Sequence, residues 1–191
     1  MRRLIQCPNG IWGRGMERHH RFSKRIAKWI ARTFDRSLPV NDLGCGLGHY
    51  CMLLQSYGFV SVTGYDGTPN IQSDTPFQPI VTIDLSLPCK IPAGQTICLG
   101  VGEHIPKKYE QTFLDNIAAS TICRCVIAWG TPEANHSGIG HVNCQSNAYI
   151  IEQLSSRGFI YEDAITNEAR SLRFGAQRRY FRTDLIYFTK P

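Results

Sequence analysis

Three glycines at alternate positions follow a short apolar run that contains an aspartate. The run reaches Asp42, and Gly44, Gly46 and Gly48 come directly after it. Glycine accepts positive φ without steric cost and lets a ligand approach the backbone closely. A helix that begins beyond such a turn offers free N–H groups and a partial positive charge. The pattern predicts a strand, a tight turn and a helix that together hold an anionic or hydroxyl-rich cofactor.

A second carboxylate follows about 20 residues downstream, which is where such folds place an acid on ribose hydroxyls. Residues 61–66 have the composition of a short strand and end in Asp66. The dinucleotide-binding fingerprint G-x-G-x-x-G needs its third glycine one residue later, at the position that His49 occupies. A nicotinamide-dependent dehydrogenase is therefore disfavoured.

The run from Asp42 to Gly48, Asp-Leu-Gly-Cys-Gly-Leu-Gly, resembles the first motif of the class I S-adenosylmethionine-dependent methyltransferases. Gly64-Tyr-Asp66 resembles their second motif, Ile83-Asp84-Leu85 the third, and Leu99-Gly-Val-Gly-Glu-His-Ile-Pro106 the motif after the fourth strand. The resemblance extends over roughly residues 38–191 and implies that the cofactor is S-adenosylmethionine.

The resemblance also implies a role for each cofactor-side residue. The backbone of Gly44, Cys45 and Gly46 would lie against the methionine part, with Asp42 orienting the turn or reaching the ammonium group through water. Asp66 would bind the two ribose hydroxyls, although an ordinary Asp-Gly turn explains the same residue. Asp84 and Leu85 would meet the adenine, and for Asp84 alone a cap or turn role is an equal alternative. The expected cofactor set is Asp42, Gly44, Cys45, Gly46, Gly48, Asp66, Gly67, Asp84, Leu85 and Gly102.

Three residues are the candidates for catalysis. Glu103 and His104 follow the fourth expected strand, whose end lies beside the switch point where ligands collect. A similar Glu-His pair occurs here in small-molecule methyltransferases of this type, so the resemblance implies that Glu103 lies near the transferable methyl group. His141 belongs to the long loop after the fifth strand and is the preferred base, because a neutral imidazole accepts a proton near neutral pH. The alternatives are that His104 only enters a helix and that His141 only pins the loop.

That loop, residues 129–145, is longer than a connection requires, and such loops often carry function. Within it, Trp129 and Asn143 are expected to contact the acceptor, and so is Trp12 from the N-terminal arm. Trp12 could form a lid over the cofactor, with its ring on adenine or on the acceptor. Two of the three have a structural alternative: Asn143 as a helix cap, and Trp12 as a tether of the arm to the core.

No metal is expected from the sequence. Zinc-ligand residue types do occur at Cys123, Cys125, His136, His141 and Cys144. Their spacing fits no closed zinc site, and two cysteines separated by one residue in a strand share a face, as core packing also requires.

The alternation of strands and helices predicts an α/β fold, one Rossmann-like domain with a mostly parallel seven-stranded sheet and helices on both faces. The family resemblance implies that the last strand is antiparallel. Residues 1–36 form an arm and a basic amphipathic helix on the acceptor side, and 37–191 form the core. Strands are expected near 39–43, 61–65, 80–83, 96–101, 123–128, 159–164 and 184–189. Helices are expected near 48–57, 70–73, 108–119 and 146–157, with residues 165–183 lacking a clear helical stripe.

Composition and charge limit the possible compartment, domain number and acceptor class. The chain has 191 residues, a net charge of +6 and eight cysteines at scattered positions, which favours reduced thiols and a cytoplasmic, non-membrane protein without a second domain. Basic residues concentrate in 14–36 and 170–182, so an RNA or DNA acceptor, for example an RNA cap, stays open beside a small polar acceptor. The motifs of ribose and base methyltransferases are absent, which favours the small acceptor. A non-catalytic, cofactor-binding accessory domain is the third interpretation.

Overall fold

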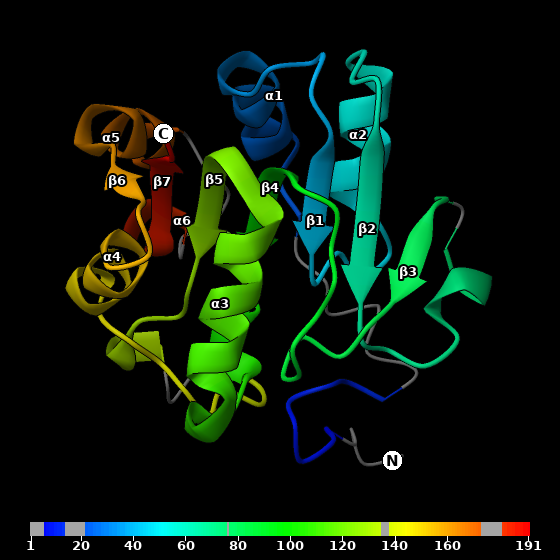
Figure 1. The fold of residues 1–191 in the computed structure, drawn as a ribbon, viewed down its shortest axis with the longest axis vertical. Helices are drawn as coiled ribbons and strands as arrows, with labels where there is room; N and C mark the ends of the chain where they lie inside the picture. Colours follow the sequence, from blue (N-terminus) through cyan, green and yellow to red (C-terminus); the bar gives the residue numbers. More distant parts are fainter. Residues whose placement is uncertain (1–5, 14–21, 76, 135–137, 173–180) are drawn as a thin grey trace.

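Alternating strands and helices build one sheet with helices on both of its faces (Figure 1). The computed structural model describes residues 6–13, 22–75, 77–134, 138–172 and 181–191. The strands are β1 (Val40–Leu43), β2 (Val62–Asp66), β3 (Ile80–Thr82), β4 (Gly94–Leu99), β5 (Thr121–Ala128), β6 (Ile160–Tyr161) and β7 (Leu185–Thr189). The helices are α1 (Lys24–Thr33), α2 (His49–Ser56), α3 (Glu110–Ser120), α4 (Asn147–Ser155), α5 (Asp163–Ser171) and α6 (Phe181–Asp184).

The strands lie in the order β3-β2-β1-β4-β5-β7-β6. The first five are parallel to one another, and β7 runs antiparallel to both β5 and β6. The expected mostly parallel sheet with an antiparallel last strand is confirmed. The chain order reverses direction across the sheet between β1 and β4, which is the switch point where open α/β sheets bind ligands.

The side chains of each strand point alternately to the two faces of the sheet and pack into two apolar layers. Val126 of β5 packs with α1 and α2 on one face, whereas Cys125 and Ile127 pack with α3 and α4 on the other. Strands buried on both faces read as continuous apolar runs, as here.

Helix α1 belongs to the first layer. Ser23 caps its N-terminus by accepting from the Ile26 N–H, and the apolar side of the helix buries Trp29 and Ile30 fully. The amphipathic helix expected in the N-terminal region is present, but it packs on the sheet beside α2 and lines no part of the cavity described below. That cavity is instead lined by the arm residues Gly10–Trp12.

The C-terminal region differs from the expectation. The sixth strand is shorter than 159–164, and α5 begins at Asp163, with a further turn of helix at α6. Helix α5 was missed because only Thr166 and Ala169 are buried, so no continuous apolar stripe marks it. A buried Thr166 hydroxyl instead accepts the Tyr187 N–H and joins the helix to β7.

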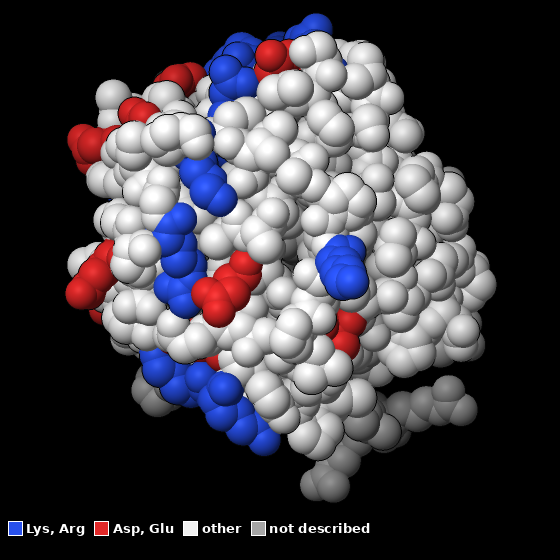
Figure 2. All heavy atoms as spheres, in the orientation of Figure 1, with Lys and Arg blue, Asp and Glu red and all other residues white. Residues whose placement is uncertain are grey.

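Charged residues do not form one continuous surface on the face in Figure 2, where Lys and Arg stand in separate groups with acidic residues between some of them. Helix α1, within the first basic segment, contacts α5 through the exposed ion pair between Arg32 and Glu168 at 3.2 Å. Arg178 and Arg179 lie outside the described residues. In the described parts of the chain, no helix has both the length and the apolar composition needed to cross a bilayer.

Candidate active site

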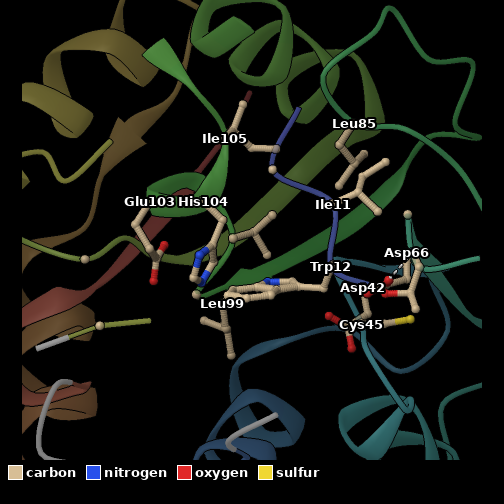
Figure 3. A pocket seen from close by; sticks show the side chains of 18 of the residues that line it. Ile11, Trp12, Asp42, Cys45, Asp66, Leu85, Leu99, Glu103, His104 and Ile105 are labelled. Carbon is tan, nitrogen blue, oxygen red and sulfur yellow. Dashed lines mark hydrogen bonds between the residues drawn. The ribbon is translucent and has the colours of Figure 1, made fainter. Parts of the chain in front are cut away.

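A cavity of about 360 Å³ opens at the carboxyl ends of the parallel strands (Figure 3). Its floor comes from the segments that follow β1, β2, β3, β4 and β5. Two segments far apart in the sequence cover it: the N-terminal arm at Gly10–Trp12 and the loop that follows β5. This is the position that the switch-point rule predicts for a ligand.

The glycine turn forms one end of the cavity. Gly44, Gly46 and Gly48 all have positive φ, at 74°, 54° and 70°. A Cβ atom on Gly44 would come within 2.3 Å of a Val101 methyl group, so a larger residue does not fit there. The turn is fixed to β2 because the Gly44 and Cys45 N–H groups donate to the Tyr65 carbonyl at 2.7 and 3.0 Å.

Asp66 joins this turn to the cavity. Its Oδ2 accepts the Gly46 N–H at 2.8 Å, and its Oδ1 accepts the Thr68 N–H at 2.8 Å. The side chain lines the cavity although the residue is only 8% exposed. Because each carboxylate oxygen has a second lone pair, Asp66 retains acceptor capacity toward a ligand with vicinal hydroxyls.

A second buried acid, Asp42, lies beside the turn and is 2% exposed. Desolvation by burial raises its pKa to about 7, and the nearby charge of Asp66 raises this pKa slightly further. A hydrogen bond from the Cys51 thiol acts in the opposite direction and lowers the pKa. The Cys51 Sγ lies 3.4 Å from Oδ2. A cationic ligand group would favour the ionised form of this carboxyl.

An apolar slot lies beyond Asp66, between Gly67, Ile83 and Leu85. The Ile11 side chain of the arm reaches this slot, since a Cβ on Gly67 would meet it at 2.6 Å. Asp84 does not line the cavity. Its Oδ2 accepts from Asn9 of the arm at 2.7 Å, and its Oδ1 accepts from the N–H and hydroxyl of Ser86.

The opposite end of the cavity gathers Glu103, His104 and His141. One ligand-type atom from each of the three lies within 4.8 Å of the others. Glu103 is 5% exposed, and desolvation by burial raises its pKa to about 7, while the backbone N–H groups of Glu103 and Gly130 lower it and Asp184 raises it slightly. Figure 3 shows the Glu103 carboxylate and the His104 ring on the same side of the cavity.

A buried network holds the loop that carries His141. The Val142 and Asn143 N–H groups donate to the Glu103 carbonyl at 2.8 and 3.0 Å. The Asn143 amide donates to Glu110 at 2.9 Å, and Glu110, itself fully buried, forms an ion pair with Lys107 at 2.7 Å.

Two residues expected to contact the acceptor serve this network instead. Asn143 binds Glu110, and Trp129 lies beneath Gly102 with its indole N–H donating to the Asn143 carbonyl at 2.6 Å. Neither lines the cavity. Both act on the site by fixing the loop.

Trp12 lies in the cavity, between the side that carries Asp42 and Asp66 and the side that carries His104 (Figure 3). Its ring meets the His104 ring edge-on at 4.9 Å between centroids. The arm is attached through the Gln6 amide, which donates to the Gly140 carbonyl at 3.2 Å, and through Gly10, where a Cβ would meet the His104 carbonyl at 2.2 Å. The arm and the loop after β5 therefore contact each other over the cavity.

The cavity thus collects most of the residues singled out from the sequence. Those that line it are Trp12, Asp42, Gly44, Cys45, Asp66, Gly67, Leu85, Glu103, His104 and His141. Those that do not are Gly46, Gly48, Asp84, Gly102, Trp129 and Asn143, which shape the turn, the strand ends or the loop.

Sequence reasoning missed Ile11, His49 and Asp184 as lining residues. His49 did carry a signal, since it directly follows the glycine turn, but Asp184 carried none, because it reaches the site only through the antiparallel return of β7. Of the residues considered for zinc, His141 and Cys144 are in contact, with 3.5 Å between Nδ1 and Sγ, but among the described residues no cysteine belongs to a group of three metal-ligand side chains; His136 lies outside the described part. The group of three metal-ligand side chains found among the described residues is Glu103, His104 and His141.

No protein-family model matches the sequence, and a search of curated proteins gave no match either. Solved structures do share the fold. Magnesium protoporphyrin IX methyltransferase (ChlM) from Synechocystis PCC 6803, crystallised with bound S-adenosylmethionine, is 19% identical with a TM-score of 0.62, over 87% of this chain and 77% of that one.

A TehB-like S-adenosylmethionine-dependent methyltransferase from Corynebacterium glutamicum ATCC 13032 is 20% identical with a TM-score of 0.66, over 93% of this chain and 94% of that one. The cyclase SpnF is 15% identical with a TM-score of 0.58, over 87% and 80%. At these identities the likeness establishes the fold, and the chemistry must be argued from the site.

Proposed function

We propose that this chain is a methyltransferase that uses S-adenosylmethionine and transfers its methyl group to a small polar acceptor. One observation carries the proposal: a single cavity connects Asp66 and the glycine turn at one end with Glu103, His104 and His141 at the other. The first end suits a nucleoside with an amino-acid tail, and the second supplies polar groups for an acceptor.

The cofactor's parts match the cavity in order along its length. The slot at Gly67 and Leu85 suits adenine, Asp66 suits the ribose hydroxyls, and the turn at Gly44 and Cys45 suits the methionine part. The buried carboxyl of Asp42 would stabilise the cofactor's positive charge. In this orientation the sulfonium methyl group faces Glu103 and His141.

The protein then needs to supply little chemistry beyond alignment. The sulfonium methyl is an activated electrophile, and holding a nucleophile in line with it contributes about 7–11 kcal/mol through proximity and orientation. Where the acceptor loses a proton, a positioned base adds about 10²–10⁴-fold. His141 is our candidate for this base, with His104 and Glu103 beside it.

The cover over the cavity supports a small acceptor over a nucleic acid. Trp12 of the arm, together with Ile139 and His141 of the loop, lines the end at which an acceptor must enter, whereas Ile11 lies at the opposite end beside Gly67. A single-stranded polynucleotide is bound in a positively charged groove, and among the described residues Figure 2 shows separated basic groups on the face in view. We infer action in the cytoplasm from the eight cysteines, all of which are free thiols.

The fold alone does not separate methyl transfer from other activities or from a non-catalytic accessory domain, since SpnF, which is described as a cyclase, shares it. A binding experiment and an activity assay separate a methyltransferase from a cofactor-binding accessory domain. Calorimetry with S-adenosylmethionine, S-adenosylhomocysteine and NAD tests the cofactor, and we expect binding of the first two only. Transfer of labelled methyl to a library of small polar acceptors tests catalysis, with an oligonucleotide pool as the competing substrate class. Cofactor binding without transfer to either class would favour the accessory domain, and NAD binding would contradict the proposal.

A further inference from the structure

We propose that Glu103, His104 and His141 bind a divalent transition-metal ion at the acceptor end of the cavity. The metal site stands on its own geometry. Its role in holding an acceptor oxygen rests on the proposed function.

The three side chains supply a carboxylate and two imidazoles, which is the donor set of facial metal sites with open coordination positions. Their ligand atoms lie within 4.8 Å of one another. An ion with bonds of about 2.1 Å holds adjacent ligands about 3 Å apart, so binding draws the three side chains inward by up to about 2 Å. The open positions would face the cavity, because all three residues line it.

The carboxylate of Glu103 gives the most direct support for a bound cation. Only 5% of the surface of Glu103 is exposed, and its Oε2 atom has no hydrogen-bond partner among the described residues. A buried acceptor without a partner is costly, and a buried charge is more so unless a cation or metal compensates it. Asp184, also buried, lines the same cavity and adds negative potential.

The imidazole of His104 is oriented as a metal ligand. Its Nδ1 lies 3.1 Å from the Gly140 carbonyl, which can only accept, so Nδ1 carries the proton and Nε2 carries the lone pair. A metal-binding histidine characteristically donates its other ring N–H to a carbonyl in this way. His141 has a comparable outer contact, with its Nδ1 3.5 Å from the Cys144 Sγ.

The three residues are also held in place independently of any ion. The Glu103 carbonyl accepts two N–H groups from Val142 and Asn143, which ties the segment after β4 to the loop after β5. The rings of His104 and His141 pack edge-on at 5.1 Å between centroids. These contacts fix the two backbone segments, so the inward movement of up to about 2 Å is left to rotation of the side chains.

Nitrogen ligands favour Zn²⁺, Co²⁺, Fe²⁺ or Mn²⁺ over the oxygen-preferring Mg²⁺ and Ca²⁺. The ion would bind a hydroxyl oxygen of the acceptor and lower its pKa, as it does for water. An imidazole that binds the ion through its lone pair cannot also take a proton there, so in the metal-loaded protein His141 acts as a ligand and not as the base. The hydroxyl proton leaves to solvent, the oxygen lone pair forms the O–CH₃ bond, and the electrons of the S–CH₃ bond return to sulfur, which leaves S-adenosylhomocysteine. The acceptor class is thereby narrowed to small molecules that carry a hydroxyl group able to bind a metal.

The test titrates the chelator-treated full chain with Co²⁺, followed by absorption spectroscopy, and with Zn²⁺ by calorimetry. Four proteins are compared: the wild type, Glu103→Gln, His141→Ala and, as a matched control, His49→Gln. His49 lines the same cavity outside the cluster and stacks on Phe22. Circular dichroism checks that each variant folds, and Glu103→Gln, which keeps the side-chain shape, decides the result where His141→Ala does not fold.

We expect one Co²⁺ per wild-type chain without thiolate-to-metal charge-transfer bands. Affinity should fall at least about 100-fold in Glu103→Gln, because losing even an outer partner of a metal ligand costs 10–100-fold. His49→Gln should bind like the wild type. No binding, thiolate bands, or equal binding by Glu103→Gln would overturn the metal site.

Titration of the same samples with S-adenosylmethionine keeps the two proposals apart. Cofactor binding without metal binding overturns the metal site and leaves the proposed function standing. Metal binding without cofactor binding does the reverse.

Discussion

Replacing Asp66 with asparagine tests the cofactor end of the site, because this one side chain holds the glycine turn and faces the ligand. Its two oxygens accept the Gly46 and Thr68 N–H groups, each at 2.8 Å. Asparagine has the same shape but one acceptor oxygen, so one backbone N–H faces an amide N–H₂. The ribose hydroxyls lose an ionised acceptor at the same time.

Hydrogen bonds to charged groups contribute about 1.5–3 kcal/mol each. Loss of one such bond to the ribose therefore weakens S-adenosylmethionine binding by about 10- to 150-fold. Loss of one bond to the turn lowers the free energy of unfolding by a similar amount. Calorimetry measures the first effect, and thermal unfolding of the ligand-free protein measures the second.

Asp115→Asn is the matched control. Asp115 lies on α3, its side chain is 68% exposed, and it pairs with Arg157 at 2.7 Å, far from the cavity lining. Such an exposed pair contributes about 0–1 kcal/mol, so cofactor affinity should stay at the wild-type value. A folded Asp66→Asn protein that binds S-adenosylmethionine as tightly as the wild type would refute the assignment of Asp66.

Three further predictions concern other parts of the site. Burial raises the pKa of Asp42 from 3.8 to about 7, so between these two values the native chain holds a proton that the unfolded chain releases. The ligand-free protein should therefore lose stability as pH rises from about 4 to 7, by at most about 1.4 kcal/mol per pH unit from this group. Asp42→Asn should flatten the dependence of Tm on pH, and an unchanged slope would contradict the assignment. Trp12 lines the cavity whereas Trp29 and Trp129 are buried elsewhere, so any change in tryptophan fluorescence on cofactor binding should disappear in Trp12→Phe, and its persistence would place the ligand away from the arm. His141→Ala should lower the rate of methyl transfer with cofactor affinity nearly unchanged, with His104→Ala as the comparison; full turnover in His141→Ala alone would move the catalytic role to His104 and Glu103.

The parts of the fold that local chemistry dictates could be predicted from the sequence. The alternate glycines at 44, 46 and 48 require positive φ, and Asp66 follows an apolar strand, so the turn and its acid were visible without coordinates. The antiparallel last strand was implied by the family resemblance and agrees with the structure, in which β7 pairs antiparallel with β5.

What sequence could not give is the set of contacts between distant segments. Asn143 is the type of residue that could bind a methyl acceptor, yet its amide donates a hydrogen bond to Glu110. Glu110 lies on α3, and nothing in the sequence marked it as a partner. Asp184 reaches the cavity only because β7 returns antiparallel beside β5. Glu103, His104 and His141 were each candidates singly, and only the folded loop shows that they converge.

The central claim is that S-adenosylmethionine lies in the cavity with its ribose at Asp66 and its sulfur toward Glu103 and His141. A crystal structure of the protein with S-adenosylhomocysteine tests it most directly. The account predicts both ribose hydroxyls within about 3 Å of the Asp66 carboxylate, adenine in the slot at Leu85, and the sulfur atom facing the Glu103–His141 end. A ligand bound in the reverse direction, or outside this cavity, would contradict it.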